Sequence, residues 1–193
     1  SMNGYRKHPV KYFSFIREVE INGVLFDVDV DILAGMYDGT KREKRSQHVQ
    51  GMKALKATGG DFAFRLEPQR ISLEAPRPDG AIDIAKVNVV ALVPYFVMKT
   101  AAMGRGKAKD AYDLCFLIKN YPGGVKQLAL EFSDFSKTPL VCEMKAKLSE
   151  KFASVDHVGP VDVANFMNLS NEQEISMLRR DAYEQVRTLL SLI

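Results

Sequence analysis

The chain has 193 residues, of which 46% are hydrophobic and 26% charged, so it can bury one good core, divided at most between two lobes. Its net charge of +3 permits a phosphate-bearing partner without requiring one. Two cysteines and three histidines make neither a disulfide framework nor a zinc site. With no signal peptide and no apolar run of membrane-spanning length, we expect a soluble, cytoplasmic protein without a membrane partner.

Residues 1–93 are predicted to form a β-rich part with an antiparallel or mixed sheet. Asn22-Gly23 is the strongest hairpin turn signal in the chain, and residues 76–80 make a second turn. The polar, basic segment 40–57 is predicted to become helical toward its end. The predicted strands are residues 11–21, 24–33, 62–66, 71–75 and 81–92.

After Pro94 the hydrophobic period changes to 3.6, so residues 94–193 are predicted to form a C-terminal helical lobe. Pro94 suits the first turn of a helix, and Asn171 with Glu174 resembles a capping box. The predicted helices are residues 94–103, 107–120, 125–135, 139–152, 161–167 and 171–193. A β-rich half followed by a helical half indicates an α+β fold.

Residues 99–114 hold a cluster of cations followed by two carboxylates that open an apolar helix. The cations are Lys99, Arg105, Lys107 and Lys109. Glycines interrupt the cluster, which favours a break between two helices. Helical spacing places Asp110 and Asp113 on the stripe that should face the core, where a carboxylate needs a partner. These carboxylates could serve chemistry, or could form a structural ion pair at a helix N-terminus.

This arrangement resembles the C-terminal motif of the AbiEii/AbiGii-type nucleotidyltransferases, bacterial toxin and phage-defence proteins of the polymerase-beta-like superfamily. The residues that carry the resemblance are Lys99, Ala102, Arg105, Lys107, Lys109, Asp110 and Asp113. The resemblance implies that Lys99 and the three cations after it contact the phosphates of an NTP. It also implies that Asp110 orients a lysine or acts as a base, with Lys99 and Asp113 beside it as catalytic residues.

Asp27, Asp29 and Asp31 alternate along the predicted strand 24–33. The apolar residues between them are predicted to pack on the opposite face. Carboxylates two residues apart on a strand lie about 6.6 Å from each other and could border one divalent cation, or could simply be solvated. The segment VDVDILAG resembles the superfamily strand that carries the third metal-binding carboxylate. The resemblance therefore implies that Asp29 and Asp31 hold Mg²⁺.

The function implied is transfer of NMP from an NTP to an acceptor, either tRNA or protein, in a toxin–antitoxin or phage-defence system. A cognate antitoxin is implied as a partner. However, no Gly-Ser turn followed by an Asp-x-Asp pair precedes Val24, and Gly59-Gly60-Asp61 lacks a second acid at the right spacing. We therefore expect this chain by itself to be inactive.

Two alternatives stand beside the transferase. The first is a catalytically inactive binding or interaction module that keeps the ionic residues as a structural network. The second, weaker alternative is a metal-dependent nuclease, for which the strand 71–75 offers only Glu74 as a further acid.

The basic segment 41–56 could contact a triphosphate or an RNA backbone, or could be a solvated surface. Its cations are Lys41, Arg42, Lys44, Arg45, Lys53 and Lys56. The absence of a P-loop motif disfavours an ATPase, and the absence of a Ser-His-Asp or Cys-His set disfavours nucleophilic hydrolysis.

Overall fold

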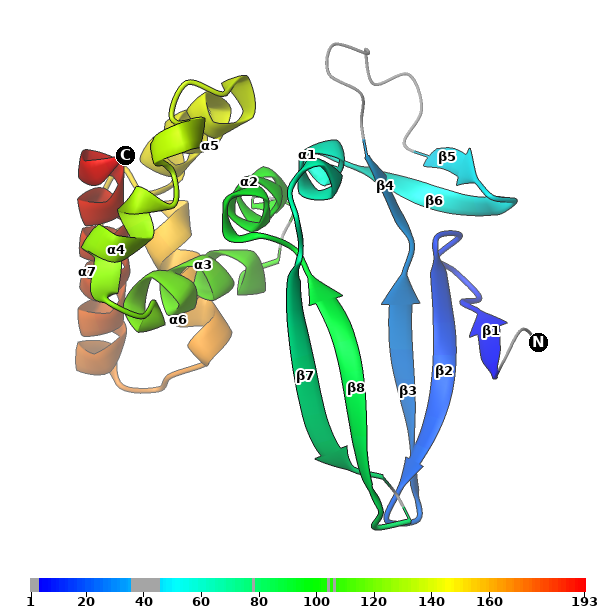
Figure 1. Ribbon diagram of the computed structural model, residues 1–193. Coiled ribbons are helices and arrows are strands. Elements are labelled where there is room, and N and C mark those ends of the chain that lie inside the picture. The colour runs from blue at the N-terminus through cyan, green and yellow to red at the C-terminus, as the bar shows by residue number, and fades with distance from the viewer. Residues whose placement is uncertain (1–3, 36–45, 78, 104, 106) are drawn as a thin grey trace. The chain divides into compact units, whose positions relative to one another are not determined.

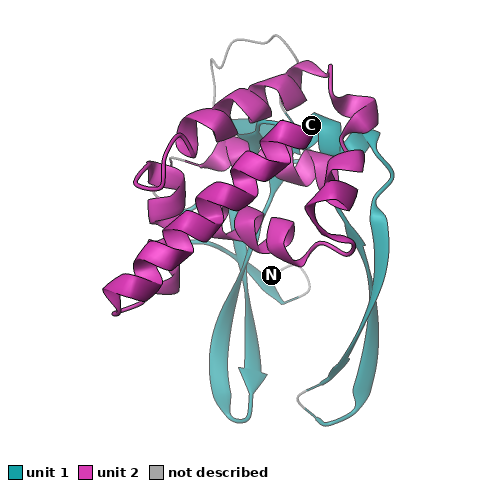
Figure 2. Cartoon of the chain, turned by 90° about the vertical axis from the view of Figure 1, so that its left-hand side faces the viewer, with its two compact units in different colours: residues 1–91 teal, residues 92–193 magenta. Residues whose placement is uncertain are grey.

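The computed structural model describes residues 4–35, 46–77, 79–103, 105 and 107–193. The chain divides into two compact units, residues 1–91 and residues 92–193, which Figure 2 colours separately. In the described residues, the first unit contains the strands and one short helix, and the second is helical. The predicted α+β fold is therefore confirmed.

The described strands of residues 1–91 form three small sheets (Figure 1). The strands are β1 (Tyr5–Lys7), β2 (Ser14–Ile21), β3 (Val24–Asp31), β4 (Leu33–Gly35), β5 (Ser46–Val49), β6 (Met52–Ala57), β7 (Gln69–Pro76) and β8 (Ile82–Val89). One sheet has the order β1-β2-β3 and is antiparallel, the second has the order β4-β6-β5 with β4 and β6 parallel, and β7 and β8 form a separate hairpin.

The β2–β3 hairpin turns at Asn22 and Gly23, whose positive φ angles of 51° and 77° are those that the predicted Asn-Gly turn requires. The strand β3 differs from its prediction on its apolar face. Phe26 and Val28 are 48% and 45% exposed, so this face is not packed into a core. The reason is that alternation places apolar residues on one face without supplying an element to cover them.

Two further predictions for residues 1–91 are wrong. The segment predicted to turn helical contains the β5–β6 hairpin, which turns at Gln50 and Gly51 with positive φ. The predicted strand 62–66 is instead the helix α1 (Gly60–Arg65). A Cβ on Gly60 would lie 2.9 Å from the Cα of Gly35, so two glycines allow α1 to approach β4. Lys41, Arg42, Lys44 and Arg45 lie outside the described residues.

The described part of residues 92–193 packs seven helical segments around one apolar core. They are α2 (Leu92–Ala102), α3 (Lys109–Asn120), α4 (Gly124–Leu130), the 3₁₀ turn η1 (Ser133–Phe135), α5 (Pro139–Lys151), α6 (Val158–Met167) and α7 (Glu172–Leu192). Phe96 and Phe132 are fully buried and meet edge to face, with ring centroids 5.4 Å apart. Asn171 caps α7, because its side-chain oxygen accepts bonds from the backbone N–H groups of Gln173 and Glu174.

None of the helices in the described part of the chain is both long and apolar enough to cross a membrane.

Candidate functional site

The helices α2 and α3 bring Lys99, Asp110 and Asp113 together around one ammonium group. Lys99 lies in the last turn of α2, and Asp110 lies in the first turn of α3. The Nζ atom of Lys99 donates to Oδ1 of Asp110 at 2.9 Å and to Oδ2 of Asp113 at 2.6 Å. The prediction that Asp110 would have a cationic partner upstream is thus confirmed, with Lys99 as that partner.

The Lys99 side chain is partly buried at this contact, with 23% of its surface exposed. Burial alone would lower the pKa of Lys99, but the hydrogen bonds to Asp113 and Asp110 outweigh it and hold the pKa above its usual value. Lys99 is therefore protonated at neutral pH. It can supply positive charge to the site, but it cannot act there as a base.

Asp113 is shared between two lysines. Its two carboxylate oxygens accept from Nζ of Lys109 at 3.0 and 2.9 Å, in addition to the bond from Lys99. Burial would raise the pKa of Asp113, but these two ammonium groups outweigh it and lower the pKa. Asp113 stays ionised, so it can orient both lysines but cannot donate a proton at neutral pH.

Tyr95 is a member of this site that the sequence analysis missed. It lies one helical turn before Lys99 on α2, and its ring centroid is 5.9 Å from the Lys99 Nζ atom. Burial raises the pKa of the Tyr95 phenol. The i, i+4 spacing of Tyr95 and Lys99 was the sequence signal that could have identified it.

Arg105 and Lys107 are exposed in the segment between α2 and α3. The N–H of Arg105 donates to the carbonyl of Ala102, and the carbonyl of Lys107 accepts from the N–H of Asp110. Among the described residues, neither side chain takes part in the ion-pair network of Lys99. The motif therefore separates into an ion-pair network, in which Lys109 is the exposed member with 62% of its side chain accessible, and two cations outside it, Arg105 and Lys107.

Asp29 and Asp31 lie on β3 in residues 1–91. Asp29 forms an ion pair with Lys11 at 2.5 Å, and this hydrogen bond lowers the pKa of the carboxyl. Asp27 is paired with Arg6 at 2.8 Å. The carboxylate stripe of β3, where the resemblance implies a Mg²⁺ site, is thus neutralised in part by Arg6 and Lys11. Within the described residues, no three His, Cys, Asp or Glu side chains gather to hold a metal.

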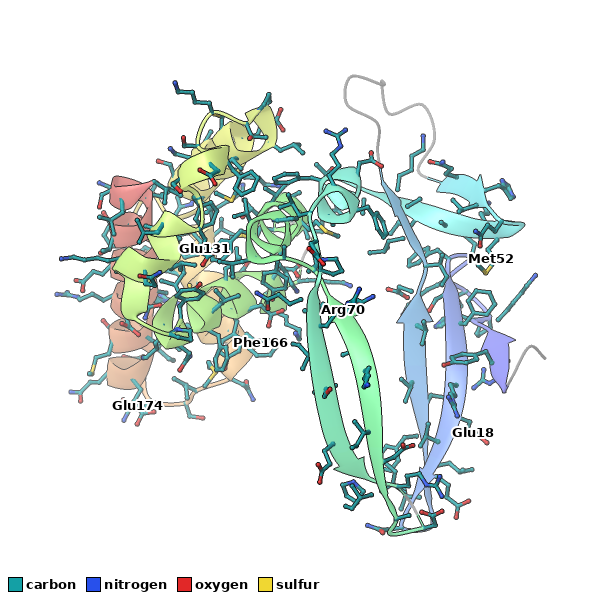
Figure 3. The ribbon with its side chains drawn as sticks, in the orientation of Figure 1. Glu18, Met52, Arg70, Glu131, Phe166 and Glu174 are labelled. Carbon is teal, nitrogen blue, oxygen red and sulfur yellow. The ribbon has the colours of Figure 1, made fainter. Side chains whose placement is uncertain are left out.

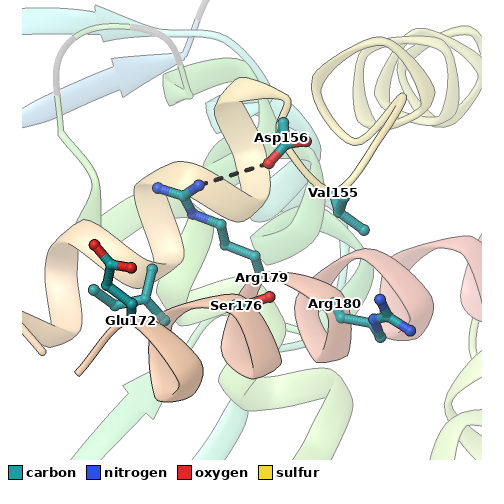
Figure 4. Close-up of a pocket in the computed structure, with 7 residues that line it drawn as sticks. Val155, Asp156, Glu172, Ser176, Arg179 and Arg180 are labelled. Atoms are coloured by element: carbon teal, nitrogen blue, oxygen red, sulfur yellow. Dashed lines mark ion pairs between the residues drawn. The ribbon is translucent and has the colours of Figure 1, made fainter.

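A separate pocket of about 350 Å³ lies in the helical unit and shares no residue with the Lys99 network (Figure 4). Arg179 contributes from α7 and pairs with Asp156 at 3.6 Å. Arg180 and Glu172 also line the pocket, so its two cations and two anions cancel. This balance gives the pocket no preference for an anionic ligand.

Comparison of the chain with family models, with curated proteins and with solved structures finds no match. The resemblance to the AbiEii-type proteins therefore rests on the residues quoted above.

Proposed function

We propose that this chain belongs to a nucleotidyltransferase of the AbiEii toxin type and that it binds the triphosphate of an NTP through its helical unit. The observation that carries the proposal is the convergence of Lys99, Asp110, Asp113 and Lys109 from two helices. These are four of the seven positions that carry the family resemblance. In the complete enzyme, the acceptor would be tRNA or protein, and a cognate antitoxin would restrain the activity.

In this proposal the Lys99 network positions the two helices, and the exposed cations contact the nucleotide. Lys99 is already neutralised by two carboxylates, so it serves to hold the start of α3 against the end of α2. Arg105 and Lys107 are exposed and lie outside this network, so they can contact phosphate oxygens, whereas Lys109 is exposed but paired with Asp113. Arg suits this task because its guanidinium binds phosphate through two parallel hydrogen bonds.

The residues present do not fit a resident Mg²⁺ ion. Asp29 and Asp31 offer the oxygen ligands that Mg²⁺ prefers, but Asp29 is engaged by Lys11, and no third metal-binding side chain joins them in the described part of the chain. No catalytic step through a metal is therefore assigned to these two residues. We accordingly expect no transfer of labelled NMP from any of the four NTPs to tRNA or protein by this chain alone.

Titration calorimetry of the chain with each of the four NTPs tests the proposal. The double variant Arg105→Ala/Lys107→Ala should weaken binding of the preferred NTP by roughly tenfold for each lost phosphate contact. The matched control is Lys126→Ala/Lys137→Ala, which removes the same charge from exposed positions elsewhere in the helical unit. Equal losses in both double variants, or no binding of any NTP, would contradict the proposal.

A second candidate function is a binding module without nucleotide chemistry, in which the Lys99 network is purely structural. The observation that favours it is the engagement of Lys99 by two carboxylates at 2.9 and 2.6 Å. Asp110→Asn distinguishes the two functions. Both functions predict a lower thermal midpoint for this variant, because the network holds α2 and α3 together in either case. The binding module predicts no nucleotide binding in any variant, whereas the proposed site predicts nucleotide binding that persists in the folded variant through the exposed cations.

A further inference from the structure

The β7–β8 hairpin has no partner strand at either outer edge in the part of the chain that the structure describes. Among the described residues, β7 is hydrogen-bonded only to β8, so the backbone N–H and C=O groups on its other edge are unpaired. Every residue of β7 is exposed. A two-stranded hairpin is only marginally stable in water, and an open edge of this kind is a template for another strand.

The sequence along this edge is complementary to itself. An antiparallel pairing of two β7 strands about a two-fold axis at Ser72 places Arg70 opposite Glu74 of the second copy, and Glu74 opposite its Arg70. Ile71 then lies opposite Leu73 on the other face, since alternate residues point to opposite faces. Pro68 and Pro76 stand four residues to either side of Ser72 and limit the pairing at both ends.

We propose that two copies of this chain associate through their β7 edges, with Ser72 on the two-fold axis. The association makes a four-stranded antiparallel sheet in the order β8-β7-β7-β8, which exceeds the three strands that independent stability requires. It forms two Arg70–Glu74 ion pairs and brings together Ile71 and Leu73, which are 38% and 52% exposed in the single chain. Figure 3 labels Arg70 on this hairpin.

The other long open edges lack this complementarity. On β3, a two-fold axis at Val28 would place Asp27 opposite Asp29 of the second copy, and like charges directly opposite each other are destabilising. On β8, an axis at Ala85 would place Ile84 opposite Lys86 and Asp83 opposite Val87. The choice of β7 follows from this contrast. Within the hairpin, Arg70 and Glu74 lie directly opposite Asn88 and Ile84 of β8, so neither faces a charged residue straight across, and Lys86, opposite Ser72 on the same face, lies diagonal to both.

Charge reversal tests the proposed pairing in sedimentation velocity experiments on the full chain. Arg70→Glu and Glu74→Arg should each weaken dimerisation by about tenfold or more, because each variant creates two like-charge pairs across the axis. The double variant Arg70→Glu/Glu74→Arg restores opposite charges and should restore the dimer. A wild-type chain that stays monomeric, or a double variant no better than the single ones, would overturn the proposal.

A cysteine cross-link tests the register directly. In a Cys142→Ser background, Ser72→Cys places two cysteines opposite each other across the axis at a separation of about 5 Å, within the range of a disulfide. Mild oxidation should give a covalent dimer. Lys86→Cys, on the same face of the neighbouring strand, lies three strand spacings from its copy and should give none. Equal cross-linking at both positions, or none at Ser72→Cys, would refute the register.

Discussion

Lys99 joins the two helices that carry the candidate site, and its contribution to stability can be measured against its neighbours. Lys99→Met removes the cation shared by two carboxylates that are 11% and 15% exposed, so we expect a loss of about 3 kcal/mol in the free energy of unfolding. Lys109→Met removes a mostly exposed partner of Asp113 and should cost less than about 1 kcal/mol. Urea denaturation of both variants checks this order, and equal losses would contradict it.

The pKa values of Asp113 and Lys99 determine the pH range over which this network stabilises the folded chain. The pKa of Asp113 is lowered below its ordinary value of 3.8. Its contribution to the free energy of unfolding is therefore present above that pH and is lost as the pH falls through the folded-state pKa. The pKa of Lys99 is raised above 10.5. Its contribution to the free energy of unfolding is therefore present below that pH and is lost as the pH rises through the folded-state pKa.

We therefore expect the difference in thermal midpoint between wild type and Asp113→Asn to be constant near neutral pH and to shrink in strong acid. Scanning calorimetry from neutral to strongly acidic pH measures this difference. A difference that grows on acidification would show that Asp113 is not stabilised in its ionised form.

At the scale of elements, α3 buries one face and leaves the other exposed. The buried residues are Asp110, Ala111, Leu114, Cys115 and Ile118. The core-facing stripe predicted for Asp110 is thus present. Asp113, predicted on the same stripe, is only partly buried, because the buried face is centred nearer Ala111 and Leu114.

The burial of this face predicts the reactivity of the two thiols. Burial raises the pKa of Cys115 to about 12, with the Asp181 carboxylate adding to the effect, whereas Cys142 on α5 is exposed. At pH 8 a disulfide reagent should modify one thiol of the native chain quickly and the second only on unfolding, since the thiolate is the reactive form. Cys142→Ser should abolish the fast reaction. Fast modification of both thiols would contradict the packing of α3.

At the scale of the whole molecule, the buried hydrophobic residues are distributed very unevenly. In the described part of residues 1–91 they are Ile16, Ala34, Ala54 and Phe62, and all the others belong to residues 92–193. Hydrophobic burial is the main favourable term in folding, so the helical unit holds most of the stabilising energy.

We expect residues 92–193 expressed alone to fold and to unfold cooperatively, and residues 1–91 alone to show no sharp transition. Thermal unfolding followed by circular dichroism compares the two pieces with the full chain. A cooperative transition in residues 1–91 and none in residues 92–193 would reverse this assignment.

The sequence by itself determined the features of this protein that depend on residues close together in the chain. The Asn22-Gly23 hairpin, the change to helices near Pro94 and the cap at Asn171 each depend on residues within a few positions of one another. The ion pair of Lys99 with Asp110 was also predictable, because only eleven residues separate them and an acid on the core-facing stripe requires a partner.

Only the tertiary structure decided the features that depend on residues distant in sequence. Residues 62–66 fit a strand and a short helix equally well, and the approach of Gly60 to Gly35 selects the helix α1. The neutralisation of Asp27 and Asp29 by Arg6 and Lys11 depends on contacts across 21 and 18 residues. The exposure of Phe26 follows from which elements cover β3. Alternation and helical spacing predict on which face of an element a side chain lies, but they do not predict which other element packs against that face.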